Sequence, residues 1–151
     1  MSVNKIFAAL VSAALIIVFP WEVCADTRYF YTQTGIEGNL LSHALNFYGD
    51  FTPDEQAFFL FDTLFLSGSS APKGTRVLSA KIYGDLLILN VSGEIKNYGG
   101  TFREMCVVDE ILTTASSVPG VAYVTLLIDG AADYLPEGSQ IFERKIFFAD
   151  T

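Results

Sequence analysis

One cysteine and one histidine of this chain have the residue types of a nucleophile and its general base, Cys106 and His43. Cys106, however, lies between Met105 and Val107 in a segment with the apolar spacing of a helix, where a free cysteine usually packs as a small hydrophobic residue. His43 is the only histidine, so the usual zinc set of histidine and cysteine ligands is not available. We therefore predict no catalytic thiol, no metal site and a buried Cys106.

Three carboxylates, Asp109, Glu110 and Asp129, could form an acid–base pair. Asp109 and Glu110 are adjacent on an expected helix and therefore point in different directions. Asp129 precedes Gly130 at the end of an expected strand, which is ordinary turn chemistry. A solvent-facing helix surface and a turn are the simpler interpretation. The glycines also lack the spacing and the following lysine of a phosphate-binding loop, so we predict no catalytic residue and no cofactor.

Two capped helices are predicted by the spacing of polar and apolar residues. Thr52, Pro53 and Glu55 have the types of an N-cap, a first-turn proline and a capping-box partner. Thr101 and Glu104 offer the same box for a second helix. Apolar stripes follow both starts, which indicates that one face of each helix is buried.

Apolar, β-branched and aromatic runs predict the strands. Arg76–Tyr83 and Leu86–Val91 are joined by Gly84-Asp85, a two-residue hairpin signal. Val121–Ile128 is a continuous apolar run, which is typical of a central strand covered by helices. Arg28–Thr34 also has the composition of a strand. Two more segments are candidates for extended structure: 40–48 and 139–151.

The order of these elements is strand, helix, hairpin, helix, strand. We predict an α+β fold, a two-layer sandwich with a small mixed sheet and both helices on one face. The uncovered sheet face and the edge strands are the places where a partner would be expected.

The N-terminal segment has the pattern of a secretory signal. Lys5 precedes a long apolar run, and Val23 and Ala25 stand three and one residues before a cleavage site at Asp26. We predict a signal peptide over residues 1–25 and a single extracytoplasmic domain over 26–151. One alternative is an uncleaved anchor, which would contact the membrane through this segment alone. Another is a lipoprotein at Cys24, which the bulky residue before that cysteine disfavours.

The charge of the chain narrows the classes of partner. Its 151 residues have a formal net charge of −8. Binding of nucleic acid needs lysine and arginine to contact the phosphates, and electrostatic binding of anionic lipid needs the same residues. We therefore expect neither partner.

Four stretches in a fixed order resemble the GerM domain, the sporulation and spore germination family. They are L-F-L-S-G at 64–68, A-P-K-G-T at 71–75, L-L-I-L-N-V-S-G-E at 86–94, and the helix at 101–116 followed by V-P-G-V-A-Y-V-T-L-L-I-D-G at 118–130. The resemblance runs from Tyr29 to Gly138. It implies an extracytoplasmic domain of spore-forming and related bacteria, similar to the ring-building modules of envelope secretion machines, and it implies no catalytic residues.

Consecutive aromatic residues mark the candidate interaction surface. In a strand such residues point to both faces of the sheet. One set therefore enters the core, and the other is either exposed or covered by the tail strand or a partner. Tyr29-Phe30-Tyr31 and Phe147-Phe148 have this arrangement. Plain core packing of a large aromatic inventory is the alternative. We predict an interaction surface that includes Tyr29, Tyr31 and Phe147.

These observations favour an exported, non-catalytic interaction or assembly domain of the bacterial cell envelope, linked to sporulation or germination. Its partners would be other envelope proteins or further copies of itself. The alternative is a peptidoglycan-binding accessory or an enzyme of wall remodelling, because aromatic rings stack on sugars and carboxylates bind hydroxyl groups.

Overall fold

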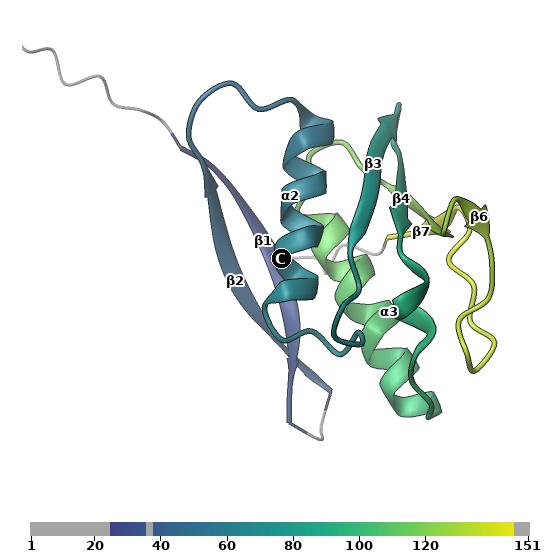
Figure 1. The fold of residues 1–151 in the computed structure, drawn as a ribbon. Helices are drawn as coiled ribbons and strands as arrows, with labels where there is room; N and C mark the ends of the chain where they lie inside the picture. Colours follow the sequence, from purple (N-terminus) through teal and green to yellow (C-terminus); the bar gives the residue numbers. More distant parts are fainter. Residues whose placement is uncertain (1–24, 36–37, 147–151) are drawn as a thin grey trace, which may run out of the picture.

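The computed structural model describes residues 25–35 and 38–146. Nearly all of the expected signal peptide, and Phe147 of the expected interaction surface, lie outside the described residues. The elements follow one another along the chain as β1 Asp26–Thr34, β2 Asn39–Phe47, α2 Pro53–Leu66, β3 Val77–Tyr83, β4 Leu86–Val91, the 3₁₀ helix η1 Gly93–Lys96, α3 Thr101–Ser116, β5 Tyr123–Ile128, β6 Ala131–Ala132 and β7 Arg144–Lys145 (Figure 1).

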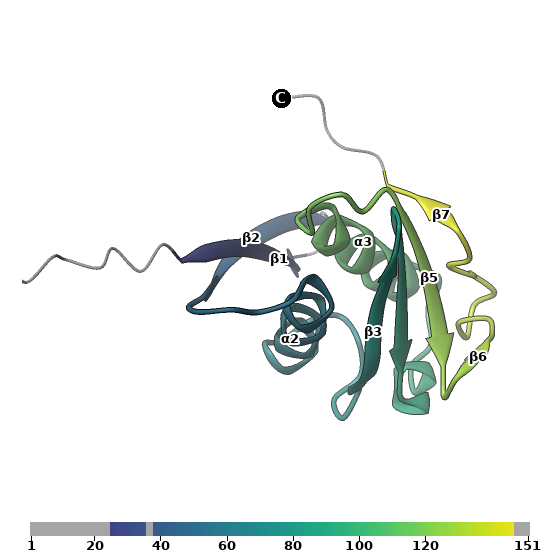
Figure 2. The same ribbon diagram turned by 90° about the horizontal axis from the view of Figure 1, so that it is seen from above.

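The main sheet is mixed and has β4 at its centre. β3 and β4 are antiparallel and joined by the predicted Gly84-Asp85 turn, and β5 lies parallel to β4 on its other side. The short strands β6 and β7 both pair antiparallel with β5. Both helices lie on the same side of this sheet (Figure 2). The predicted α+β fold with a small mixed sheet and two helices on one face is confirmed.

A second sheet lies on the far side of the helices. β1 and β2 pair with each other over their full length, from Asp26 opposite Phe47 to Thr34 opposite Asn39. This hairpin packs against α2 and α3 on the side away from β3, β4 and β5 (Figures 1 and 2). The helices are therefore enclosed between two sheets, an arrangement that the order of the elements alone does not predict.

The core lies between the helices and the main sheet, where α2, α3, β4 and β5 each contribute fully buried aliphatic or aromatic side chains. The largest fully buried apolar side chains, which include one from η1 and one from the loop before β7, are Leu60, Phe61, Leu64, Leu87, Leu89, Val91, Ile95, Val107, Ile111 and Ile141. The β1–β2 hairpin adds Phe30 to the same cluster. Burial of one apolar side chain of this size stabilises a fold by about 1.5–3 kcal/mol, so this cluster is the main source of stability.

The start of α2 is fixed by the capping box that the sequence predicts. The Thr52 hydroxyl accepts the Glu55 N–H at 3.3 Å, and the Glu55 carboxylate accepts the Thr52 N–H at 2.9 Å. α3 begins differently. Its N-cap is Gly100, at φ 104°, and no side chain caps it, so the predicted box of Thr101 and Glu104 is wrong. Glu104 is instead turned toward another part of the chain, as described below.

Removal of the Thr52 cap should therefore cost more than removal of the Thr101 hydroxyl. We expect Thr52→Ala to lower the free energy of unfolding by about 1 kcal/mol, because an N-cap hydroxyl satisfies a helix N–H that has no other partner. Thr101→Ala is the matched control and should change it by less than about 0.5 kcal/mol. Urea unfolding of both variants measures the difference, and equal losses would contradict the assignment of the caps.

Candidate interaction surface

Tyr29 and Tyr31 lie on the outer face of the β1–β2 hairpin. Phe30 and Thr32 alternate with them and are each 6% exposed, because their side chains face the helices. Tyr29 is 44% exposed and Tyr31 is half-buried. Across the pair, Tyr29 is opposite Ala44 and Tyr31 is opposite Ser42. Both tyrosines therefore stand beside exposed small residues on the neighbouring strand.

Polar side chains of α3 cover the edge of β1 that faces away from β2. Tyr31 N–H donates to the Thr114 hydroxyl at 3.1 Å, and Gln33 N–H donates to the Glu110 carboxylate at 2.8 Å. At the end of the helix, the Ser117 hydroxyl accepts the Tyr29 N–H at 3.2 Å and lies 2.7 Å from the Tyr29 carbonyl oxygen. Positions 110, 114 and 117 share one side of a helix, so the C-terminal half of α3 accepts the N–H of every second residue along this edge.

The edge of β2 has no such cover among the described residues. Because Tyr29, Tyr31 and Gln33 direct their N–H groups toward α3, the alternate residues of β1 pair with β2. It follows from the register that Leu40, Ser42, Ala44 and Asn46 direct their backbone groups away from β1. Figure 1 shows β2 on the outside of the hairpin, with β1 between it and the helices.

Glu110 joins three segments through one buried carboxylate. It is 1% exposed and accepts the N–H of Gln33 and, at 2.8 Å, the N–H of Ser70, whose hydroxyl donates to it at 2.9 Å. Burial raises the pKa of the Glu110 carboxyl, although these hydrogen bonds oppose the shift. The expectation that Glu110 belongs to a solvent-facing surface is therefore wrong. The carboxylate holds β1 and the loop after α2 against α3.

Glu104 likewise joins α3 to other segments, on a different side of the helix. It is 1% exposed and accepts the N–H groups of Ser139 at 2.7 Å and Glu137 at 2.6 Å, and the Tyr98 hydroxyl at 3.2 Å. Burial alone would raise the pKa of its carboxyl, but the hydrogen bonds from Ser139, Glu137 and Tyr98 outweigh it and hold the pKa below its ordinary value. This carboxylate fixes the loop between β6 and β7.

Cys106 is buried, as predicted, at 6% exposure. Burial, together with the negative charges of Glu110 and Asp109, raises the pKa of its thiol and so disfavours the reactive thiolate. His43 lies elsewhere, on β2, where its ring stacks on Phe30 at 4.8 Å and its Nε2 is 2.9 Å from the Thr32 hydroxyl. No hydrogen bond joins His43 to Cys106 in the described part of the chain.

We expect Cys106→Ala to lower the free energy of unfolding by about 1–2 kcal/mol, the usual range for a small core truncation. The function of the domain should be retained, because the thiol only fills space. Thermal unfolding and a cell-based assay for loss of function measure the two effects. A variant that folds but has lost its function would overturn the structural role.

Asp129 belongs to a turn, as predicted. It has φ 48°, its carboxylate accepts the Gly93 N–H at 3.1 Å, and the Asn90 side chain accepts the Gly130 N–H at 2.8 Å. A Cβ at Gly93 would approach the Asp129 carboxylate to 2.5 Å, so a larger residue there would displace this carboxylate from its hydrogen bond. These contacts tie the end of β4 to the end of β5.

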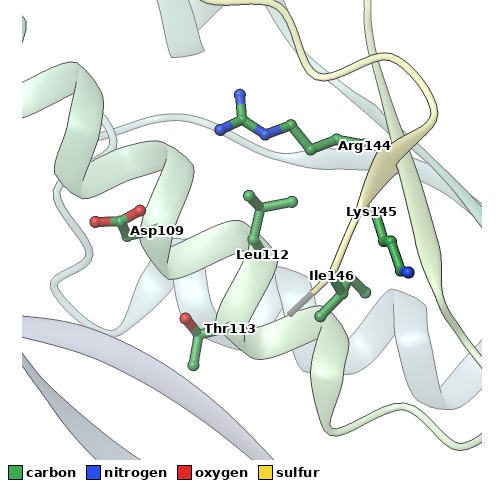
Figure 3. Close-up of a pocket in the computed structure, with 6 residues that line it drawn as sticks. All are labelled: Asp109, Leu112, Thr113, Arg144, Lys145 and Ile146. Atoms are coloured by element: carbon green, nitrogen blue, oxygen red, sulfur yellow. The ribbon is translucent and has the colours of Figure 1, made fainter. Parts of the chain in front are cut away.

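Asp109 is exposed at the rim of a cavity of about 220 Å³ between α3 and β7. Figure 3 shows Leu112 and Ile146 at this cavity, with the Arg144 side chain extended toward α3 and Lys145 pointing away from it. The three carboxylates considered above therefore lie in three separate settings and form no acid–base pair.

Two further properties concern only residues 25–35 and 38–146. No group of three or more histidine, cysteine, aspartate and glutamate side chains is placed so that it could hold a metal ion. None of the helices in this part is both long enough and apolar enough to cross a bilayer.

Comparison with known proteins decides the family. A sequence model of the Germane family, described as sporulation and spore germination, matches residues 27–134. The chain belongs to the Germane family. The predicted resemblance to the GerM domain is thereby confirmed, and the Germane domain accounts for β1 to β6 of this fold. No curated protein sequence matches the chain.

Three solved structures are similar to the Germane domain in fold, and each covers 80% of this chain. The tandem GerMN domains of the sporulation protein GerM from Bacillus subtilis match over 45% of their length, with 19% identity and a TM-score of 0.62. The first GerMN domain of that protein matches over 96%, with 19% identity and a TM-score of 0.57. A predicted lipoprotein from Clostridium perfringens matches over 86%, with 18% identity and a TM-score of 0.56.

Proposed function

We propose that this Germane domain is exported and acts as a non-catalytic interaction module of the bacterial cell envelope, in sporulation or germination. The observation that carries the proposal is the outer face of the β1–β2 hairpin, where Tyr29 and Tyr31 stand side by side next to the small residues Ser42 and Ala44. Tyrosine offers a large contact area at low entropic cost and is enriched where proteins meet.

The similar solved structures support a role in the cell envelope and in sporulation. One similar structure is a predicted lipoprotein and another is the sporulation protein GerM, so an envelope location fits both. The signal pattern of residues 1–25 supports export. Domains of this kind resemble modules that assemble side by side, and the exposed hairpin supplies a surface for such contacts.

The alternative is that the same tyrosines stack on the sugars of peptidoglycan. They lie two residues apart on one face of a strand, about 7 Å from each other along the chain, so both rings face the same side of the hairpin. Sedimentation with purified peptidoglycan separates the two functions. The proposed function predicts that the protein stays in the supernatant. Pelleting that is lost in Tyr29→Ala/Tyr31→Ala and kept in Tyr83→Ala/Tyr134→Ala would favour the alternative.

A further inference from the structure

Within residues 25–35 and 38–146, the edge of β2 that faces away from β1 has no cover, and it differs in this from the other long strand edges. The β1 edge is closed by side chains of α3. On the edge of β3, the Ile82 N–H donates to the Asp54 carboxylate at 2.9 Å, and Lys81 pairs with the same carboxylate. Natural proteins blunt exposed edges with charge, proline or bulges. β2 has none of these, since its nine residues read N-L-L-S-H-A-L-N-F and pair in an unbroken register.

We propose that β2 pairs antiparallel with β2 of a second copy of this chain, about a twofold axis at His43, to form a continuous four-stranded sheet. The inference rests on the proposed function, since it identifies one partner of the interaction module. His43 is the middle residue of β2, so this register overlaps the whole strand. Leu40 then pairs with Asn46 of the partner and Ser42 with Ala44 of the partner, with about eight ladder hydrogen bonds in total.

The side chains of β2 complement one another in this register. On the face toward the helices, Leu41 is 50% exposed and would lie opposite Leu45 of the partner, while the two His43 rings would meet and extend the Phe30–His43 stack. On the outer face, the small residues Ser42 and Ala44 of both copies would form a central strip between two rows of tyrosines. Cross-strand pairs of this kind stabilise a sheet.

Charge also favours a second copy at this edge. The chain has 17 acidic and 9 basic residues, so two copies repel each other over most of their surfaces. β2 contains none of those charges, so two copies can approach there without direct repulsion between charged side chains of the paired strands. The contact uses the same patch on both molecules, so it closes at two copies.

The test uses the full chain, with its own leader, produced in a bacterial host that exports it. Two tagged versions, Ser42→Cys and Ala44→Cys, are made together and oxidised. In the proposed register these cysteines face each other at about 5.5 Å between Cα atoms, within reach of a disulfide. We expect a covalent heterodimer of the two versions, several-fold more abundant than either homodimer. Leu78→Cys, at an exposed position of the β3 edge, is the control and should give none.

Charge substitutions test the same register without a covalent bond. Ser42→Asp/Ala44→Asp places like charges opposite each other and should weaken dimerisation of the exported protein about tenfold or more. Ser42→Lys/Ala44→Asp places opposite charges there and should restore it. Asn97→Asp/Phe102→Asp adds the same charge far from β2 and should have no effect. Circular dichroism shows whether each variant is folded.

A monomeric wild-type protein together with no heterodimer of the cysteine versions would overturn the β2 contact. So would a disulfide adduct with a host protein alone. Neither result would overturn the interaction module itself, because the tyrosine surface can bind a different protein and is tested separately below.

Discussion

Glu104→Ala is expected to lower the free energy of unfolding by about 3 kcal/mol. The substitution leaves the N–H groups of Glu137 and Ser139 and the hydroxyl of Tyr98 without their acceptor. A polar group that loses its partner in a buried site costs about 1–3 kcal/mol. These three donors are part-buried, so we expect about 1 kcal/mol for each. Met105→Ala is the control, since Met105 is exposed on the same helix and should cost less than about 0.5 kcal/mol.

The effect of Glu104 should depend on pH in a defined direction. Its pKa is lower in the folded protein than in the unfolded chain, so its contribution is fully present above the ordinary pKa of a glutamate. That contribution is lost as the pH falls through the folded value. Urea unfolding over the acid range should therefore show a smaller loss of stability for Glu104→Gln than for the wild type. Parallel curves would contradict this.

Glu110→Ala is expected to cost about 2–3 kcal/mol and to loosen the β1–β2 hairpin. It removes the acceptor for the Gln33 N–H and for both the N–H and the hydroxyl of Ser70, each of which is part-buried. A part-buried donor that loses its partner costs about 1 kcal/mol. Hydrogen exchange should rise at Gln33 and Ser70 in particular. Exchange that is unchanged at both amides would contradict the role of Glu110 as the joint between these segments.

The pH dependence at Glu110 should have the opposite sign. Its pKa is higher in the folded protein than in the unfolded chain. Between these two values the folded protein keeps a proton that the unfolded chain has lost, so stability falls as the pH rises through this window. Glu110→Gln should remove this fall. At neutral pH it should also cost less than Glu104→Gln, because burial already disfavours the charge at position 110.

Local sequence patterns predict most of the elements because local interactions determine them. The capping box of Thr52 and Glu55 and the Gly84-Asp85 turn act within a few residues, and both are present as predicted. The apolar run before Asp129 becomes the parallel strand β5 beside β4. The family resemblance, which depends on the order of such stretches, is confirmed by the Germane match.

The roles of the two buried glutamates could not be predicted in the same way. Glu104 has the spacing of a capping-box residue, and only the loop at 137–139, more than thirty positions away, shows that it serves another segment. In the sequence, Glu110 resembles a surface carboxylate, because the residues near it in the chain do not show that β1 packs against it. One signal was available, since Glu110, Thr114 and Ser117 form a polar stripe at helical spacing. Most side-chain hydrogen bonds go to backbone groups or water, and these three side chains accept backbone N–H groups of β1.

Part of the candidate interaction surface can be predicted from the sequence. Alternation predicts that one set of the β1 aromatics enters the core, and Phe30 does so while Tyr29 and Tyr31 remain outside. The open edge beside them could not be predicted, because it depends on which edge of β1 the helix α3 covers. That choice is made by tertiary packing between segments more than eighty residues apart.

Photocrosslinking at Tyr31 in intact cells tests the interaction module most directly. A photoreactive amino acid replaces Tyr31 in the full exported chain, and Tyr83, a 64% exposed tyrosine on β3, is the matched control position. The proposed function predicts a discrete protein adduct or a homo-oligomer at position 31 and only monomer at position 83. Monomer at both positions, together with retained function of a folded Tyr31→Asp variant, would contradict it.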